Sequence, residues 1–451
     1  MKKTVDLLNG KILSSLMELA VPIMATSLLQ MAYNLTDMAW IGRVGSAAVA
    51  SVGSAGMYTW LSTGVVMLAK MGGQVKAAHS LGEGNGEKAA QYGKGAIQLA
   101  AALAVVYGLI MVAFSGKLIG FFNLQDPGIV EDAEKYLKIA GGMILFSFLN
   151  QTLTGLFTAS GDSKTPFLAN FAGLAGNMIL DPLLIFGIGG LPGLGAAGAA
   201  AATVTAQAIV TFLMLRGVKR DKVLFDKIRI WEKTPREYLW EMIRISLPSS
   251  IQETLYCAIS MVLTRLIAGW GDRAVAVQRV GGQIESISWM AAEGFGMALN
   301  AFIGQNYGAG KYQRMKKGYV TAFVMMMAWG AFTTGVLVFL NGPIFRLFIN
   351  EPDVVPVGMD YLRILGYGQM FMCLELMTVG ALAGMGKTFV SSCISISLTS
   401  ARIPLALLLG GTALGLNGIW WALTVSSTLK GITFCLTFIF ILNRIGREKA
   451  G

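Results

Sequence analysis

Four polar residues in two widely separated apolar segments have the types and the spacing of a cation site. Tyr33 and Asp37 are four residues apart in the first apolar segment, and Asn177 and Asp181 are four residues apart in the fifth. In a helix, residues four positions apart lie on one face. Two carboxylates, an amide and a hydroxyl offer hard oxygen ligands suited to Na⁺. Carboxylates brought close together would instead favour a bound proton, so H⁺ is the other candidate ion.

An ionisable side chain at the centre of a bilayer costs about 3 kcal/mol or more, so such groups usually face a polar cavity and often mark an ion pathway. We therefore interpret Asp37, Asn177 and Asp181, with Tyr33, as an ion-coupling site. The alternatives are a structural hydrogen-bond network, or acids that are simply hydrated near the outer surface. Pro182 follows Asp181 and removes a backbone donor, so it can bend the helix there.

The composition indicates that these residues lie in a lipid bilayer. The chain is 54% hydrophobic and 14% charged, whereas soluble proteins carry about 25% charged residues. The net charge is +11, but the basic residues concentrate in short connections between apolar segments. That is the pattern of cytoplasmic membrane loops, so we expect the bilayer, and no nucleic acid, as a partner.

A spanning helix needs roughly 20 mostly apolar residues, and on that rule the sequence predicts an all-α integral membrane protein with twelve transmembrane helices. The second and the eighth are interrupted by charged residues, namely Lys70, Lys76, Glu285 and Glu293. The predicted spans are 12–39, 51–80, 90–116, 133–159, 165–188, 194–217, 238–268, 280–303, 315–340, 358–384, 390–412 and 416–443.

The distribution of basic residues predicts the orientation. The N-terminus, the C-terminal tail and alternate connections hold 22 of the 36 Lys and Arg residues. Because cytoplasmic loops carry the excess of positive charge, both termini are expected on the cytoplasmic side of a prokaryotic inner membrane.

Sequence matches at a nearly constant offset indicate an internal repeat. Residues 17–22 match residues 243–248, and Gly82-Glu83-Gly84 matches Gly308-Ala309-Gly310, both at a shift of 226. Gly161 is matched to Gly384 at a shift of 223. Six helices in each repeat give two parallel, pseudo-symmetric bundles with a substrate cavity between them.

These offsets predict three regions: an N-terminal six-helix lobe at 1–217, a basic cytoplasmic linker at 218–237 and a C-terminal six-helix lobe at 238–451. The repeat places Leu263 opposite Asp37, so the second lobe has no copy of the first acid site. Glu253 and Glu375 are its candidates for contact with a cationic substrate. The competing interpretation pairs them with Arg265 or Arg402.

Several motifs together resemble the multidrug and toxic compound extrusion (MATE) family over essentially the whole chain. They are Pro22, Asn34-Leu35-Thr36-Asp37, Gly42-Arg43-Val44-Gly45, Gly72-Gly73-Gln74, Gly161-Asp162-Ser163-Lys164-Thr165-Pro166, Asn177-Met178-Ile179-Leu180-Asp181-Pro182 and Gly304-Gln305-Asn306-Tyr307-Gly308-Ala309-Gly310.

The resemblance implies a V-shaped MATE/MOP-type fold and alternating access driven by Na⁺ or H⁺. In the DinF-like branch, the cation site corresponds to Asp37, Asn177, Asp181 and Tyr33, with Thr203 as the candidate sixth-helix threonine. The NorM branch relies on an acid where this chain has Tyr256, with Glu253 one turn earlier, so the DinF-like branch is favoured. Asn34 joins Glu253 and Glu375 as a candidate residue of the substrate cavity.

The predicted function is secondary active antiport that exports amphipathic or cationic organic compounds in exchange for H⁺ or Na⁺. The alternative within the superfamily is a lipid-linked oligosaccharide flippase, against which the acidic cluster counts. A receptor or intramembrane enzyme would need a sensory domain or a catalytic constellation, so we predict no enzyme activity. No cofactor beyond the coupling ion is expected, and the chain is expected to be monomeric.

Overall fold

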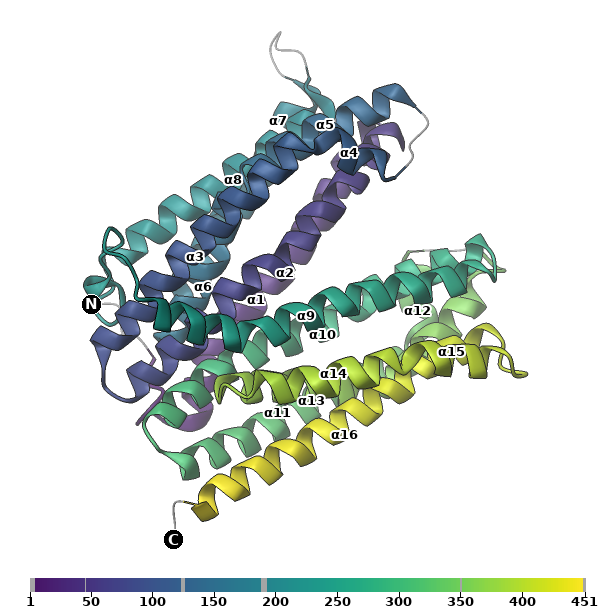
Figure 1. Ribbon diagram of the computed structural model, residues 1–451. Coiled ribbons are helices and arrows are strands. Elements are labelled where there is room, and N and C mark those ends of the chain that lie inside the picture. The colour runs from purple at the N-terminus through teal and green to yellow at the C-terminus, as the bar shows by residue number, and fades with distance from the viewer. Residues whose placement is uncertain (1–4, 45, 123–125, 188–192, 349–350, 449–451) are drawn as a thin grey trace. The chain divides into compact units, whose positions relative to one another are not determined.

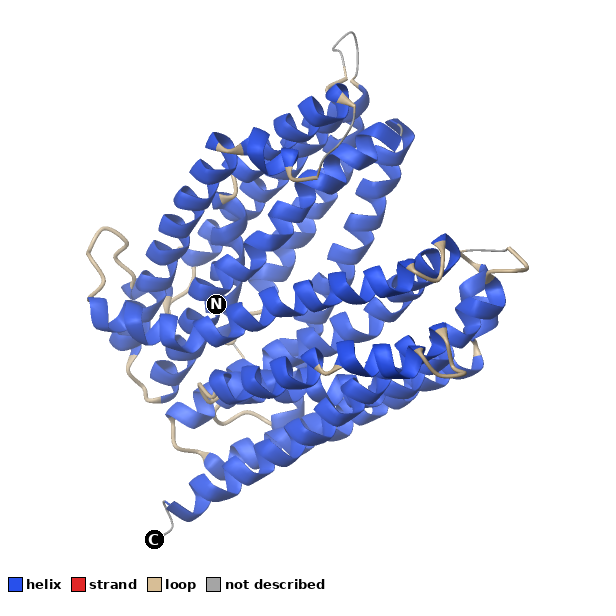
Figure 2. Cartoon of the chain, turned by 45° about the vertical axis from the view of Figure 1, so that its right-hand side comes forward, coloured by secondary structure: helices blue, strands red, loops and turns tan. Residues whose placement is uncertain are grey.

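The computed structural model describes residues 5–44, 46–122, 126–187, 193–348 and 351–448, and all regular elements in these ranges are helical (Figure 1, Figure 2). The first half contains α1 (Ile12–Val44), α2 (Ser46–Gly82), α3 (Gly86–Ala113), α4 (Ser115–Gly120), α5 (Pro127–Gly142), α6 (Leu145–Ala159), α7 (Lys164–Phe186) and α8 (Gly195–Val218). The second half contains the 3₁₀ turn η1 (Phe225–Lys227), α9 (Arg236–Ala268), α10 (Asp272–Gly308), α11 (Tyr312–Phe339), α12 (Asn341–Arg346), α13 (Val355–Gly384), α14 (Thr388–Ser400), α15 (Arg402–Gly410) and α16 (Leu416–Glu448).

The twelve predicted spans correspond to this set of helices. Among the described residues, eight helical segments are long and apolar enough to cross a membrane, and the pair α5 and α6, bent by 43°, makes a ninth. The other three predicted spans are α2, α9 and α10, which have 37, 33 and 37 residues and are less apolar. A spanning helix needs only about 20 residues, so these three are also long enough.

The internal repeat is confirmed helix by helix. Helices α2 and α10 both have 37 residues, α3 and α11 both have 28, and the short α4 and α12 both have 6. Their first residues differ by the same shift of 226 that the sequence matches gave. The two halves are therefore copies of one six-helix arrangement.

Glycines with positive φ mark equivalent turns in the two halves and correct one of the predicted matches. Gly84 (φ 75°) and Gly310 (φ 68°) end the turns before α3 and α11, as the matched motifs imply. After α6 and α13, the equivalent glycines are Gly161 (φ 87°) and Gly386 (φ 73°), at a shift of 225. The match of Gly161 to Gly384 was wrong by two residues, because Gly384 is still helical. The turn geometry, which only glycine adopts easily, sets the register.

The chain folds into two compact units. Unit 1 comprises Met1–Val5 and Ala25–Ser250, and unit 2 comprises Asp6–Met24 and Ile251–Gly451. Helices α1 and α9 are each divided between the units two residues after a proline, Pro22 or Pro248. The start of each long helix thus belongs to a different unit from its end.

The basic connection expected at 218–237 packs within unit 1. The Phe225 ring lies 4.5 Å from that of Phe157, measured between centroids. Gln98 of α3 donates hydrogen bonds to the carbonyls of Ile230 (2.7 Å) and Glu232 (2.8 Å). Backbone groups of this irregular segment therefore have partners on α3.

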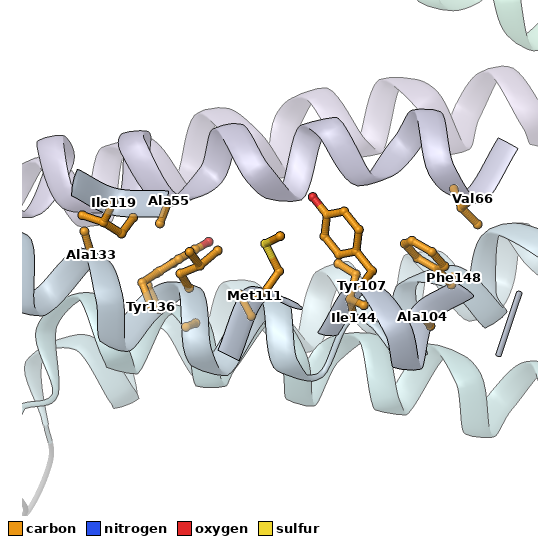
Figure 3. Close-up of a cluster of buried hydrophobic side chains, with 14 of the residues drawn as sticks. Ala55, Val66, Ala104, Tyr107, Met111, Ile119, Ala133, Tyr136, Ile144 and Phe148 are labelled. Carbon is orange, nitrogen blue, oxygen red and sulfur yellow. The ribbon is translucent and has the colours of Figure 1, made fainter. Parts of the chain in front are cut away.

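The interior of unit 1 is filled by side chains from every helix of the first half, α1 to α8. Figure 3 shows Ala55 and Val66 of α2 together with Tyr107 and Met111 of α3, and with side chains of α5 and α6. The Tyr107 hydroxyl donates to the Tyr58 carbonyl at 2.5 Å, so this buried phenol has a partner. This packed layer fixes the helices that carry the acid site.

Candidate functional site

Helix α7 buries a single stripe of residues four positions apart. The stripe runs through Thr165, Ala169, Gly173, Asn177, Asp181 and Ile185. Residues on the other side of the helix are exposed, with Leu168 at 53% and Ile179 at 64%. The polar pair therefore faces the interior of unit 1, and the apolar face is left for lipid. Asn177 is 1% and Asp181 is 0% exposed.

Helices α1 and α8 bring three more predicted residues to unit 1. Tyr33 and Asp37 lie on consecutive turns of α1, and the Tyr33 hydroxyl is 3.2 Å from the Thr203 hydroxyl of α8. Asp37 and Asp181 are close enough to act on one another electrostatically. Helix α7 packs along α8 (Figure 1). The structure thus gathers Tyr33, Asp37, Asn177, Asp181 and Thr203 from three helices.

The two acids and the amide of this cluster have buried polar atoms without hydrogen-bond partners among the residues that the structure describes. In the described part of the chain, no hydrogen-bond partner reaches either carboxylate oxygen of Asp181, the amide oxygen and nitrogen of Asn177, or Oδ1 of Asp37. Buried polar groups in folded proteins are hydrogen-bonded with few exceptions, and each exception calls for an explanation. A cluster of unpartnered oxygens on three facing residues has the chemistry of a site for a small cation or a proton.

Tyr136 of α5 is a further residue of this cluster that sequence reasoning missed. It is 8% exposed, and its phenol interacts electrostatically with both Asp37 and Asp181. Figure 3 shows it in the packed interior of unit 1. At the shift of 225 it corresponds to Tyr361 of the second half, but that correspondence alone does not connect it with the acids.

The described residues contain no group of three or more His, Cys, Asp or Glu side chains placed to hold a metal ion. The donor set is instead two carboxylates with an amide and hydroxyls. Such hard oxygen donors with low total charge fit a monovalent cation better than a transition metal. Asn34 lies in helix α1, but its side chain is outside the described part of the structure.

In unit 2, the structure pairs Glu375 with a base that the sequence interpretation did not name. Its Oε1 accepts a hydrogen bond from Lys430 Nζ of α16 at 2.7 Å. Arg402 instead donates to the hydroxyls of Ser426 (3.1 Å) and Ser427 (3.0 Å). For Glu375, the expected partners Arg265 and Arg402 were wrong, because α13 packs closely on α16 and brings Lys430 to this acid.

Glu253, the other candidate for contact with a cationic substrate, is a half-buried residue of α9. Glu293 of α10 is close enough to act on it electrostatically. Tyr256, which occupies the position of the NorM-type acid, lies near both Glu253 and Glu375. Unit 2 therefore holds a polar interior of its own, built from different helices.

A family model described as MatE matches residues 22–183 and again 248–408. A probable multidrug resistance protein NorM of Thermotoga maritima is 28% identical, over 94% of this chain and 92% of that protein. An FAD transporter of Shewanella oneidensis is 24% identical, over 96% of this chain and 95% of that protein. A crystal structure of MATE in the bent conformation has a TM-score of 0.92 at 22% identity and covers 100% of both chains.

The repeated helical frame with polar clusters buried in its interior defines a multi-pass membrane transporter built from two like halves. The two family matches begin 226 residues apart, which is the shift of the repeat. Because they cover well over half of the sequence, the chain belongs to the MatE family, a family of multidrug efflux transporters and not of enzymes. The choice between DinF-like and NorM-like branches stays a prediction.

Proposed function

We propose that this chain exports amphipathic or cationic organic compounds in exchange for Na⁺ or H⁺, and that Asp37, Asn177 and Asp181 form the site of the exchanged ion. The observation that carries the proposal is the pair of acids in unit 1 whose buried oxygens, both of Asp181 and Oδ1 of Asp37, have no hydrogen-bond partner among the described residues. Two uncompensated carboxylates away from water are costly unless a cation or proton joins them.

The same geometry suggests how ion binding changes the protein. Asp37 is on α1 and Asp181 on α7, so a cation bound by both links the two helices. When the ion leaves, the carboxylates repel one another. Pro182 removes one backbone hydrogen bond of α7 directly after Asp181, which makes bending easiest at this point. Tyr33 and Thr203 join α1 to α8 and complete the set of oxygen ligands.

The proposed setting is the prokaryotic cytoplasmic membrane, with both termini in the cytoplasm and a monomeric chain. The positions of the basic residues support this orientation. For a cationic substrate, Glu253 is a better candidate than Glu375, because the charge of Glu375 is already balanced by Lys430. Asn34 remains a candidate for the cavity.

The test is transport of ethidium in proteoliposomes under an imposed ion gradient. We expect Asp37→Asn and Asp181→Asn each to lose gradient-driven transport, because an amide cannot balance a cation or carry the proton. Glu131→Gln is the matched control, since Glu131 is an exposed acid on α5 that pairs with Lys135 at 2.8 Å. Undiminished gradient-driven transport in both aspartate variants would remove the proposed site.

Two further comparisons in the same vesicles define the ion and the substrate charge. Na⁺ and proton gradients are imposed separately, and the gradient that drives ethidium transport identifies the ion. FAD is offered in place of ethidium, since one relative is named an FAD transporter. Transport of FAD without ethidium would replace the proposed cationic substrate by an anionic one and leave the ion site in place.

A further inference from the structure

The ion pair of Glu375 and Lys430 is the most deeply buried one in the described part of the chain. The side chains are 9% and 5% exposed, and their charged atoms are 2.7 Å apart. Glu375 lies on α13 and Lys430 on α16, two helices packed along one another within unit 2. Both partners come from apolar helices, so neither reaches water easily.

The groups around this pair form a polar cluster in the interior of unit 2. Lys430 lies near Arg402, and Tyr256 lies near Arg402, Glu285 and Glu375. Glu285 accepts a hydrogen bond from Gln369 at 2.9 Å and is close to Arg402. Glu375 and Glu285 thus share one polar cluster with the bases Lys430 and Arg402.

In the described ranges, the two acids of the proposed ion site in unit 1 have no fixed counter-charge of this kind. Among the described residues of unit 1, no Lys or Arg forms an ion pair with Asp37 or Asp181, and both oxygens of Asp181 and Oδ1 of Asp37 have no hydrogen-bond partner. A carboxylate binds a lysine ammonium and a small inorganic cation through the same attraction of opposite charges. The lysine differs because it is attached to the chain, so its effective concentration at the carboxylate does not fall when the surrounding ion does.

We propose that Lys430 is a tethered counter-ion that occupies a monovalent-cation site at Glu375, so that unit 2 exchanges no ion at this carboxylate. The inference extends the proposed function, since it explains why ion exchange is assigned to the carboxylates of unit 1. Shortening Lys430 uncovers the site, which then takes Na⁺ or a small primary ammonium ion. Lys430 thereby sets the number of exchangeable cations that the protein binds.

The test is chemical rescue of Lys430→Ala. The purified variant in detergent is heated in choline chloride and in methylammonium chloride at equal ionic strength, because choline is too large to enter the space of a lysine head group. We expect methylammonium to raise the midpoint of thermal unfolding of Lys430→Ala by several degrees and to leave the wild-type midpoint unchanged. NaCl is the second probe, and its effect on the unfolding midpoint of Lys430→Ala is compared with its effect on the midpoint of the wild type.

The control is the double variant Glu375→Gln/Lys430→Ala, which keeps the space and removes the carboxylate. We expect it to lose the methylammonium response. Equal responses of the single and the double variant, or no response of a folded single variant, would overturn the proposal. The single and the double variant differ only at Glu375. The difference between their methylammonium responses therefore does not depend on whether Asp37 and Asp181 couple transport.

A transport measurement keeps the proposal testable if Lys430→Ala does not fold. The variant Glu375→Gln/Lys430→Met replaces the pair by two neutral side chains of similar size. We expect it to move the same number of coupling ions per ethidium as the wild type. A smaller number of coupling ions per ethidium would show that Glu375 exchanges an ion in the wild type. That result would contradict the proposal that Lys430 occupies this carboxylate permanently.

Discussion

The two halves of the chain carry charge at different positions of one repeated frame. At the shift of 225 that relates Gly161 to Gly386, Glu375 of α13 corresponds to Asn150 of α6. Asn150 is neutral and hydrogen-bonded, since it donates to the Gln207 side chain at 2.8 Å and accepts from Thr211 at 2.8 Å. Where unit 2 has a buried ion pair, unit 1 therefore has a network of neutral groups.

The opposite holds at the acids of unit 1. Asp37 corresponds to the buried Leu263 at a shift of 226, and Asp181 corresponds to Leu405 at the shift of 224 that relates the first residues of α7 and α14. Each half is charged where the other is neutral. The duplicated frame thus carries a site fit for an exchangeable ion in one copy and a fixed ion pair in the other.

The helices around these sites differ in the same way. The fourth span of unit 1 is broken into α5 and α6 with a bend of 43°, whereas its copy α13 runs without interruption from Val355 to Gly384. The break follows the pair Gly141-Gly142, which has no side chains to stabilise a straight helix. A bent span beside the acids and a straight one beside the ion pair agree with a movable site in unit 1 and a fixed one in unit 2.

The largest expected effect on stability comes from separating the ion pair. Lys430→Met leaves a buried carboxylate without a counter-charge, and we expect a loss of about 3–5 kcal/mol in the free energy of unfolding. Glu375→Gln/Lys430→Met should recover most of this loss, because neither partner is then charged. Unfolding in detergent measures both. A double variant as unstable as the single one would mean that packing, not charge, makes Lys430 important.

Much of this comparison could be predicted from the sequence. The twelve spans follow from apolar length, and the acid cluster follows from Tyr33–Asp37 and Asn177–Asp181, because four-residue spacing fixes a helix face. The partner of Glu375 could not be predicted, since the choice among Arg265, Arg402 and Lys430 depends on which helices pack together. The break between α5 and α6 was also missed, because the sequence there has no proline to mark it.

A smaller effect is expected where α7 approaches α8. A Cβ at Gly173 would meet a methyl group of Val210 and lie 3.2 Å from the Ala206 carbonyl oxygen. Gly173→Ala should therefore push the helices apart and cost about 1–3 kcal/mol of stability. Because Asn177 and Asp181 lie on the next turns of the same face, ion-driven ethidium transport should fall as well.

Gly176→Ala provides the control on the same helix. A Cβ there meets only Ile209, at an ordinary distance of 3.7 Å. We expect stability to stay the same or rise by about 0.5–1 kcal/mol, since alanine favours the helix over glycine. Equal losses of stability in Gly173→Ala and Gly176→Ala would show that α7 tolerates no added methyl group. The close approach of α7 to α8 would then not explain the effect at Gly173.

The smallest expected effect distinguishes the two halves by a pair of equivalent tyrosines. Tyr136 and Tyr361 are related by the shift of 225, and each lies beside an acid of its own half. Tyr136 is beside Asp37 and Asp181, and Tyr361 is beside Glu285. Tyr136→Phe removes one hydroxyl next to the proposed ion, and we expect the coupling-ion concentration for half-maximal transport to rise about 3- to 10-fold, as for the loss of one hydrogen bond. Tyr361→Phe keeps the ring that packs on Trp420 and should leave that concentration unchanged. A larger shift for Tyr361→Phe than for Tyr136→Phe would place the exchangeable ion in unit 2 and contradict the ion site proposed at Asp37, Asn177 and Asp181.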